Sequence, residues 1–284
     1  MYNERQILWT NRWSQGTERN FWMQDTADLI MDLTHTYSKD WIELFPDLHY
    51  LDCTDIEGTD MYCTEEAEEE LQKRIAVYPL RGIHFIDSGN YHYMTALFVR
   101  RVEEPYNLLF FDNHNDMKPT LIPELISCGA WAKQVLEEDK NLGKLVLIGP
   151  SKETIEEIEI GDQEKLLCVS WEELEMAENA AESEGGLHKL LQDIWEQVDT
   201  KRPLYLSIDK DVLFEEHART NWDQGHMSLP LLKKILEDCC QRSRLLGADI
   251  CGELPDAPLG QAAEVRRINE QTNTELYRLL KKYI

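Results

Sequence analysis

The chain has 284 residues, 42% of them hydrophobic, and its formal net charge is −25. A chain this acidic repels phosphates, which argues against a nucleic acid partner and favours a cationic substrate. No apolar run reaches the ~18 residues of a membrane span, and seven cysteines without metal-finger spacing or an export leader predict reduced thiols in the cytoplasm. A chain of this length can form one large α/β domain over residues 1–284.

The first part of the chain is the hardest to interpret. Residues 1–45 are rich in Trp, Asn, Thr and Arg and show no clear periodicity. We expect this divergent N-terminal segment to pack on the main domain, with a substrate lid or a subunit contact as the alternative. The strand pattern begins at His49–Cys53, a helix is expected over Glu65–Val77, and the next strand covers Gly82–Asp87.

The later elements alternate regularly between strand and helix. We expect strands at Asn107–Phe111, Lys144–Ile148, Lys165–Val169 and Pro203–Ile208. We expect helices over Pro123–Glu138, over Leu187–Val198, from the cap residue Ser228 through Cys239, and from Gln261 to the end. This alternation predicts right-handed crossovers and a mostly parallel sheet of about seven or eight strands.

Two acidic motifs follow buried strands at the point where each strand ends. Asp112-x-His114-x-Asp116 follows the strand at Asn107–Phe111, and Asp209-x-Asp211 follows the strand at Pro203–Ile208. The carboxyl ends of parallel strands open into one crevice, and alternate residues of an extended chain point the same way. These five side chains carry up to four negative charges, which a pair of divalent cations would neutralise.

A sixth ligand is available in the turn Ser88-Gly89-Asn90-Tyr91-His92, which follows the strand at Gly82–Asp87. A single histidine at the start of a helix is usually a cap or a packing residue. Beside two acidic motifs at matching strand ends, we interpret His92 as a metal ligand.

The order of these motifs resembles the arginase and agmatinase superfamily of ureohydrolases, over about Gly82 to Pro255. The resemblance implies a three-layer α/β/α fold and two Mn²⁺ ions, and often a homo-oligomer. It implies that His92, Asp112, Asp116 and Asp209 bind one metal and that Asp112, His114, Asp209 and Asp211 bind the other, with Asp112 and Asp209 bridging. Filling all six positions favours two-metal ureohydrolases over deacetylases that use one zinc.

The chain also departs from the family pattern. The turn before His92 reads Gly89-Asn90-Tyr91 where typical members have Gly-Gly-Asp, and Cys128-Gly129 stands where they have His-Gly. A thiol can relay a proton, although its ordinary pKa is near ~8.5. Glu253 resembles the acid that holds the guanidinium in the family, with a shift of one residue.

The resemblance implies a hydroxide shared by two metals that attacks the carbon of a guanidino or amidino group. Asp116 would pass a proton to the leaving amine, and Cys128 or His226 would exchange protons with solvent. For His226 and His217 the alternative is a solvated loop histidine.

The substrate is expected to be cationic, such as an arginine side chain, free or within a peptide as for peptide arginases, with urea as a product. The alternatives are a deacetylase or formimino-type hydrolase on the same scaffold, and a non-catalytic metal-binding protein. Iron, cobalt or zinc would also suit these mixed ligands.

Overall fold

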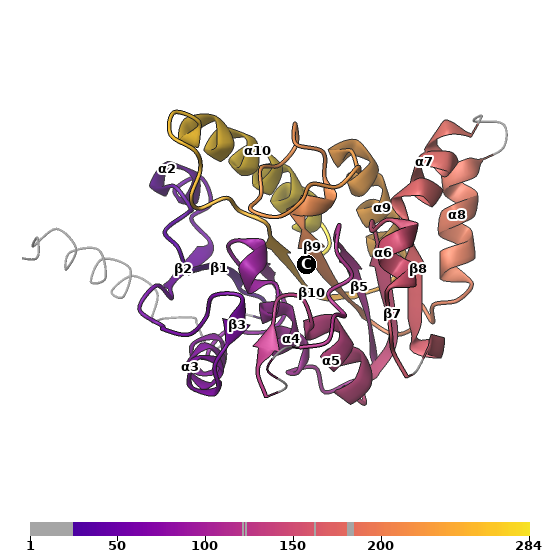
Figure 1. Cartoon of the computed structure of the whole chain (residues 1–284), viewed down its shortest axis with the longest axis horizontal. Coiled ribbons are helices and arrows are strands. Elements are labelled where there is room, and N and C mark those ends of the chain that lie inside the picture. The colour runs from indigo at the N-terminus through magenta and orange to yellow at the C-terminus, as the bar shows by residue number, and fades with distance from the viewer. Residues whose placement is uncertain (1–24, 121, 123, 162, 181–184) are drawn as a thin grey trace, which may run out of the picture.

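Eight parallel strands form the central sheet of the protein in the computed structural model (Figure 1). The structure describes residues 25–120, 122, 124–161, 163–180 and 185–284. The strand order is β2-β1-β4-β10-β9-β5-β7-β8, and every pairing in this sheet is parallel. The strands are β1 (Asp28–Asp32), β2 (Leu48–Asp52), β4 (Ile83–Phe85), β5 (Tyr106–Phe111), β7 (Leu142–Ile148), β8 (Leu166–Val169), β9 (Leu204–Asp209) and β10 (Leu245–Cys251). The α/β class and the expected number of strands are confirmed.

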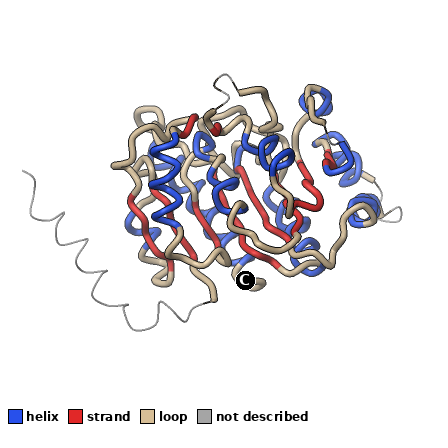
Figure 2. Tube along the Cα trace, turned by 90° about the horizontal axis from the view of Figure 1, so that it is seen from below, coloured by secondary structure: helices blue, strands red, loops and turns tan. Residues whose placement is uncertain are grey.

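Helices cover both faces of the sheet and complete three layers (Figures 1 and 2). The described helices are α2 (Lys39–Ile42), α3 (Glu65–Ile75), α4 (Met94–Val99), α5 (Trp131–Glu138), α6 (Lys152–Glu156), α7 (Trp171–Asn179), α8 (Gly186–Trp195), α9 (Leu229–Arg242) and α10 (Ala262–Leu280). One hydrophobic core joins the sheet to α3, α4 and α5, and a second joins it to α8, α9 and α10. Alternate residues of β5 enter opposite cores, as the period of a strand requires: Leu108 and Phe110 on one face, Leu109 and Phe111 on the other.

The strand pattern begins earlier than the sequence indicated. β1 lies inside the segment that was expected only to pack on the domain, and it pairs with both β2 and β4. Its five residues are all buried, including the aspartates at its two ends. Asp28 is tolerated there because Tyr277 and Lys281, far along the chain, donate hydrogen bonds to its carboxylate. Residues 1–24 of the N-terminal segment lie outside the described residues.

The helix expected over Pro123–Glu138 is also shorter than predicted. Helix α5 begins only at Trp131, and Ile126–Ser127 instead forms the short strand β6. This strand pairs antiparallel with β3 (Tyr62–Cys63) outside the main sheet. The backbone N–H of Cys128 then donates to the carbonyl of Met61, so this loop is held against β3 and does not form a helix.

The remaining predicted elements agree with the structure within a few residues. Ser228 caps α9 as expected, because its side chain accepts the backbone N–H of Leu231. Helix α7 was not predicted, although Ser170 and Glu173 form a capping box at its start. No helix in the described part of the chain is both long and apolar enough to cross a bilayer.

Strands β1 and β4 approach each other closely at Gly82, which offers a test of the packing. A Cβ atom at Gly82 would lie 1.7 Å from the carbonyl oxygen of Ala27. We expect Gly82→Ala to lower the free energy of unfolding by about 3 kcal/mol, because the new Cβ would clash with a backbone carbonyl that cannot move without distorting the strand. Urea denaturation measures this loss. Gly161→Ala is the control, since a Cβ there meets nothing within 4 Å, and equal stability of the two variants would contradict the packing.

Candidate metal centre

Three segments that are distant in the sequence meet at the carboxyl edge of the sheet. His92 follows the 3-10 turn η2 (Gly89–Tyr91) after β4, residues 112–116 follow β5, and residues 209–211 join the end of β9 to the 3-10 turn η5 (Lys210–Val212). Strand β9 lies beside β5, and β10 lies between β9 and β4. Because parallel strands end at the same edge, this order brings the predicted ligands around one crevice.

The first group of side chains surrounds the buried imidazole of His92. Its Nδ1 lies 3.1 Å from Asp112 Oδ2, 2.9 Å from Asp116 Oδ2 and 3.7 Å from Asp209 Oδ2. Among the described residues, however, this Nδ1 finds no hydrogen-bond partner of acceptable geometry. The carboxylate oxygens therefore lie close to Nδ1 but not in the direction of a good hydrogen bond. Such an arrangement suits a cation that binds the nitrogen and the oxygens together.

The second group lies next to the first and shares one residue with it. His114 Nδ1 lies 2.9 Å from Asp211 Oδ2 and 3.3 Å from Asp112 Oδ1. Asp112 therefore directs one oxygen at each group, as a bridging carboxylate would. Asp209 differs: its Oδ2 faces His92, while its Oδ1 accepts the backbone N–H of Asp211 at 2.9 Å. The sets His92/Asp112/Asp116 and Asp112/His114/Asp211 each have ligand atoms within 4.8 Å of one another, as coordination of one ion requires.

The acidic segments are more tightly folded than an extended chain. Asp112 Oδ1 accepts the backbone N–H of His114 at 2.6 Å, and Asp116 adopts a left-handed conformation with φ of 48°. The indole Nε1 of Trp131 donates to Asp116 Oδ2 at 2.6 Å and fixes that carboxylate. The prediction that these side chains converge was correct, but the extended backbone assumed for it was wrong. A non-glycine residue held at positive φ is a strain that functional sites often retain.

The hydrogen bonds of His92 leave one ring nitrogen free to bind a cation. Its Nε2 lies 2.9 Å from Ser207 Oγ, and that hydroxyl donates to Asp249 Oδ1 at 2.6 Å. Because Ser207 gives its proton to Asp249, its oxygen accepts the proton of Nε2, and Nδ1 is left as the ligand atom. Ser207 and Asp249 were not predicted as part of the site. Their signal in the sequence is only that they lie on β9 and β10, inside the strands that end there.

Burial and mutual repulsion perturb the acids of the centre. Burial, and then the charge of Asp112, raise the pKa of Asp116 to about 7. Burial also raises the pKa of Asp211, and the neighbouring charges of Asp209 and Asp112 add to it. Although burial opposes it, Asp112 and Asp211 raise the pKa of His114 to about 12. The cluster therefore demands positive charge, and divalent cations meet the same demand as the histidine protons.

Glu253, predicted to hold a guanidinium, already has partners within the chain. Its side chain is buried and forms an ion pair with Lys210 Nζ. Asn273 Nδ2 donates to its Oε1 at 2.7 Å, and Asn269 Nδ2 donates to its Oε2 at 3.0 Å. Lys210 is fully buried and turns toward α10, away from the two aspartates on either side of it. Both oxygens of Glu253 therefore already accept hydrogen bonds within the chain, and its role toward a guanidinium stays a prediction.

The two predicted proton carriers lie in different surroundings. Cys128 is buried among apolar residues, and burial raises the pKa of its thiol to about 12. His226 is exposed, and its ring packs against Trp171 at 4.5 Å and Phe214 at 6.1 Å between centroids. His217 is likewise engaged locally, because Thr272 donates to its carbonyl. The roles assigned to Cys128 and His226 stay predictions.

Trp222 borders the exposed edge of the centre, although it was not among the predicted site residues. The side chain of His114 is 23% exposed, whereas those of the other five predicted ligands are at most 9% exposed. The indole of Trp222 lies 5.6 Å from the ring of His114, and its Nε1 donates to Asn90 Oδ1 at 2.9 Å. At Gly89, a Cβ would lie 2.7 Å from this indole. His114 is therefore the most exposed of the six predicted ligands, and Trp222 lies beside it.

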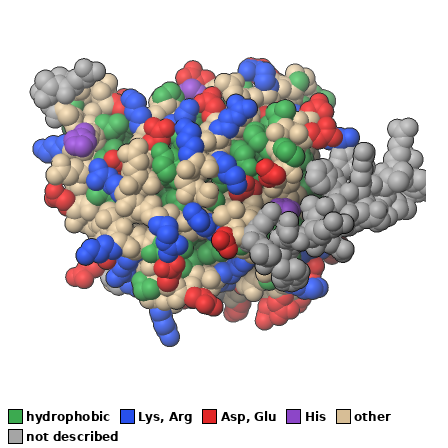
Figure 3. Space-filling view, turned by 180° about the vertical axis from the view of Figure 1, so that it is seen from behind, with side chains coloured by type: hydrophobic (Ala, Val, Ile, Leu, Met, Phe, Trp, Pro, Cys, Tyr) green, Lys and Arg blue, Asp and Glu red, His purple; other side chains and the backbone are tan. Residues whose placement is uncertain are grey.

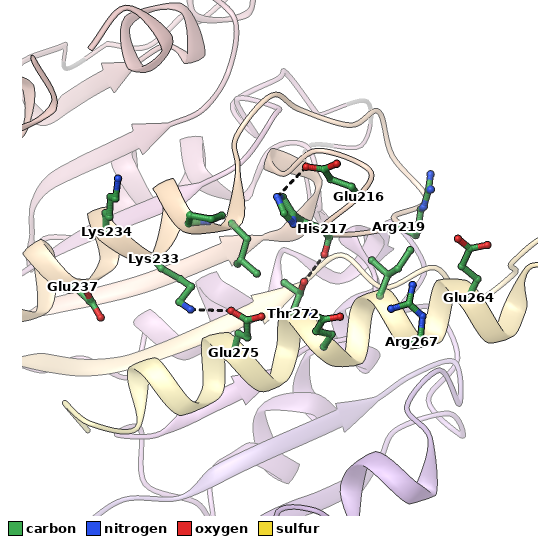
Figure 4. A pocket seen from close by; sticks show the side chains of 14 residues that line it. Glu216, His217, Arg219, Lys233, Lys234, Glu237, Glu264, Arg267, Thr272 and Glu275 are labelled. Carbon is green, nitrogen blue, oxygen red and sulfur yellow. Dashed lines mark hydrogen bonds and ion pairs between the residues drawn. The ribbon is translucent and has the colours of Figure 1, made fainter. Parts of the chain in front are cut away.

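A groove between α9 and α10, with a volume of about 560 Å³, lies away from the centre (Figure 4). None of the six predicted ligands is among the described residues that line it. Acidic and basic side chains alternate along it, and Lys233 is paired with Glu275. On the face of the molecule seen from behind, Lys and Arg are likewise interspersed with acids (Figure 3). The groove therefore shows no preference for one sign of charge.

Comparisons with known proteins agree with the fold described above. A sequence model of the arginase family matches residues 26–260. An uncharacterized protein from Thermotoga maritima is 30% identical over 188 residues, which are 66% of this chain. The matched segment spans 65% of that relative's length.

Three solved structures share the fold, although their sequences have diverged. Arginase from Bacillus subtilis has a TM-score of 0.61 at 12% identity, covering 90% of this chain and 98% of its own. A formiminoglutamase variant from Trypanosoma cruzi, solved with Mn²⁺, has a TM-score of 0.62 at 13% identity, covering 93% and 94%. Proclavaminate amidino hydrolase from Streptomyces clavuligerus has a TM-score of 0.59 at 17% identity, covering 89% and 91%. At these identities the likeness shows the fold alone.

Asp87 anchors the turn that carries His92. It adopts a left-handed conformation with φ of 66° at the end of β4 and is buried. Its carboxylate accepts the backbone N–H groups of Leu33 and Thr34, each at 2.9 Å, and that of Ser88 at 2.7 Å. Burial nevertheless raises the pKa of Asp87 from 3.8 to about 7. The folded protein therefore holds this proton more tightly than the unfolded chain does.

We predict that this raised pKa makes the metal-free protein less stable as the pH rises. The contribution of Asp87 is fully present below pH 3.8 and is lost as the pH rises through about 7. Asp87→Asn should make the free energy of unfolding less dependent on pH. The part of the pH-dependent change that it removes is at most about 4 kcal/mol. Urea denaturation of chelator-treated protein across this pH range measures it. The same substitution at the exposed Asp47 is the control, and an unchanged slope in Asp87→Asn would contradict the assignment.

Proposed function

The chain belongs to the arginase family, and from that premise we propose that it is a binuclear-metal hydrolase that cleaves a C–N bond of a guanidino or related amidino group. Family membership and fold support amidino or guanidino hydrolysis in general. One observation carries the proposal for this chain: two groups of ligand atoms lie next to each other and share Asp112. Two adjacent cation positions are what a binuclear hydrolase needs.

The residues present fit a pair of divalent cations. His92, Asp112, Asp116 and Asp209 would hold one ion, and Asp112, His114 and Asp211 would hold the other, with Asp209 as a second bridge. Two such cations supply Lewis acidity and lower the pKa of a shared water from about 15.7 toward 7. Manganese is the metal that the family resemblance implies, and mixed nitrogen and oxygen ligands also suit iron, cobalt and zinc.

The chain itself supplies proton transfer and orientation. Asp116 would pass a proton to the leaving amine through the carboxylate oxygen that does not face His92. Trp131 keeps the Oδ2 atom of Asp116 beside His92 during that transfer. Ser207 and Asp249 keep the imidazole of His92 in one tautomer. All of these contacts lie within the chain itself, which is how a protein preorganises a site.

The access route favours a narrow, planar substrate group. Five of the six ligand side chains are nearly inaccessible, and the entrance passes His114 and Trp222. An arginine side chain, free or within a peptide, is long and thin enough to reach the centre while its remainder stays outside. The net charge of −25 would attract such a cation.

The ion pair between Lys210 and Glu253 favours a second candidate of the same reaction class. With Glu253 neutralised by a fully buried ammonium, no free carboxylate is provided there for a guanidinium. A formimino group needs that carboxylate less, because its cation has fewer N–H donors than the five of an arginine guanidinium. Formimino hydrolysis would release formamide where guanidino hydrolysis releases urea, so the products separate the two.

The proposal is tested with full-length protein purified without chelator. We expect about two divalent metals per chain by elemental analysis, and release of urea from arginine or an arginine-containing peptide. Formamide release from a formimino substrate would support the second candidate. Two bound metals without hydrolysis across both panels would indicate a metal-binding protein that does not catalyse.

A substitution at the shared carboxylate makes the test specific. We predict that Asp112→Asn loses metal from both positions, because Asp112 directs one oxygen at each. Activity should fall by more than about 100-fold, since changes to residues that only support ligands already cost about 10–100-fold. Asp47→Asn, the same change at an exposed position away from the centre, should keep both metals. Full metal content in Asp112→Asn would count against the shared position.

A further inference from the structure

A thiol lies against the first group of ligands. Cys251 is the last residue of β10, the strand between those that lead to His92 and to Asp209, and it is fully buried. Its Sγ lies 3.1 Å from Asp209 Oδ2 and donates its proton to that oxygen. The ligand atoms of His92, Asp209 and Cys251 all lie within 4.8 Å of one another.

An independent observation points to a ligand at the same place. The Nδ1 atom of His92 is buried and has no hydrogen-bond partner among the described residues, while its Nε2 is satisfied by Ser207. The oxygen that Cys251 contacts is also the Asp209 oxygen that lies 3.7 Å from this Nδ1. A nitrogen, an oxygen and a sulfur therefore face one point from three strand ends.

The backbone at this position is shaped for close approach. Gly252 follows Cys251 with φ of 90°, and a Cβ there would lie 2.6 Å from Asp209 Oδ1 and 2.8 Å from the backbone nitrogen of Lys210. Only glycine leaves room for the end of β10 to lie this close to the end of β9. The absence of a side chain at Gly252 thus keeps Cys251 against the carboxylate.

We propose that Cys251 is a sulfur ligand of the metal ion held by His92, Asp112, Asp116 and Asp209. This inference rests on the proposed binuclear centre and adds one ligand to it. A bond forms between Sγ and the metal, the S–H bond breaks, and its proton leaves to water, as in other cysteine metal sites. No electron is transferred in this step.

The added sulfur has a consequence for metal identity. Thiolates prefer softer or borderline ions such as zinc, iron and cobalt, whereas carboxylates alone suit manganese. The first position should therefore favour zinc or cobalt over manganese. The second position, with His114, Asp112 and Asp211, is not affected.

Cobalt provides a direct test because a thiolate bound to Co²⁺ gives an intense charge-transfer band in the near ultraviolet. Chelator-stripped full-length protein is titrated with Co²⁺, and bound cobalt is counted by elemental analysis. We expect the band to saturate at one equivalent and to be absent from Cys251→Ser. Cys128→Ser is the matched control, because Cys128 is also buried near the acids but belongs to none of the three candidate ligand groups found among the described residues. It should keep the band.

The outcomes separate this inference from the proposed function. If two cobalt ions bind and no band appears, or if the band survives in Cys251→Ser, Cys251 is only a hydrogen-bond donor to Asp209 and the inference is overturned. If no cobalt binds, the binuclear centre itself is wrong. Should Cys251→Ser fail to fold, X-ray absorption of the zinc-loaded wild type decides: a sulfur shell at about 2.3 Å supports the inference, and its absence overturns it.

Discussion

The concentration of four buried carboxylates at one edge of the sheet is the constraint on which the rest of the structure depends. Asp112, Asp116, Asp209 and Asp211 lie within a few ångströms of two histidines, and none of the four side chains is more than 9% exposed. Like charges in a poorly solvated place repel strongly unless positive charge or hydrogen-bond donors compensate them. The chain supplies donors from Trp131, from backbone N–H groups and from Cys251. These donors orient the oxygens, and cations remain the natural source of the missing charge.

The ends of these strands contribute side chains both to the centre and to the packing of the domain. Asp209 and Asp211 face the metal positions, while Lys210 between them reaches Glu253 and Asn273 and so ties the same turn to α10. His92 is held in a similar way, because its second nitrogen is bonded through Ser207 to Asp249 in the middle of the sheet. Ligands fixed by such contacts need no rearrangement before they bind an ion, which is the usual function of the residues around a metal site.

The differences from the family pattern lie beside the ligands and not among them. All six predicted ligand positions carry His or Asp, and the arginase family model matches the chain over residues 26–260. The departures at Cys128 and Glu253 would instead bear on proton transfer and on the charge of the substrate. A family fold that keeps its metal ligands while its neighbouring residues change is expected to keep its type of reaction and to alter its substrate.

The sequence by itself determined most of the sheet and the ligand positions. Apolar runs followed at once by acids indicate strands that end in a crevice, and that pattern is local, so it can be read from Asn107–Phe111 and Pro203–Ile208 alone. Strand β1 was missed because its flanking aspartates are acceptable inside a sheet only with partners such as Tyr277, 249 residues away. The tertiary structure alone decided that Glu253 pairs with Lys210, 43 residues before it, and that Cys251 meets Asp209, 42 residues before it. These contacts depend on the order of the strands in the sheet, which places β10 beside β9, and no local pattern of residues encodes that order.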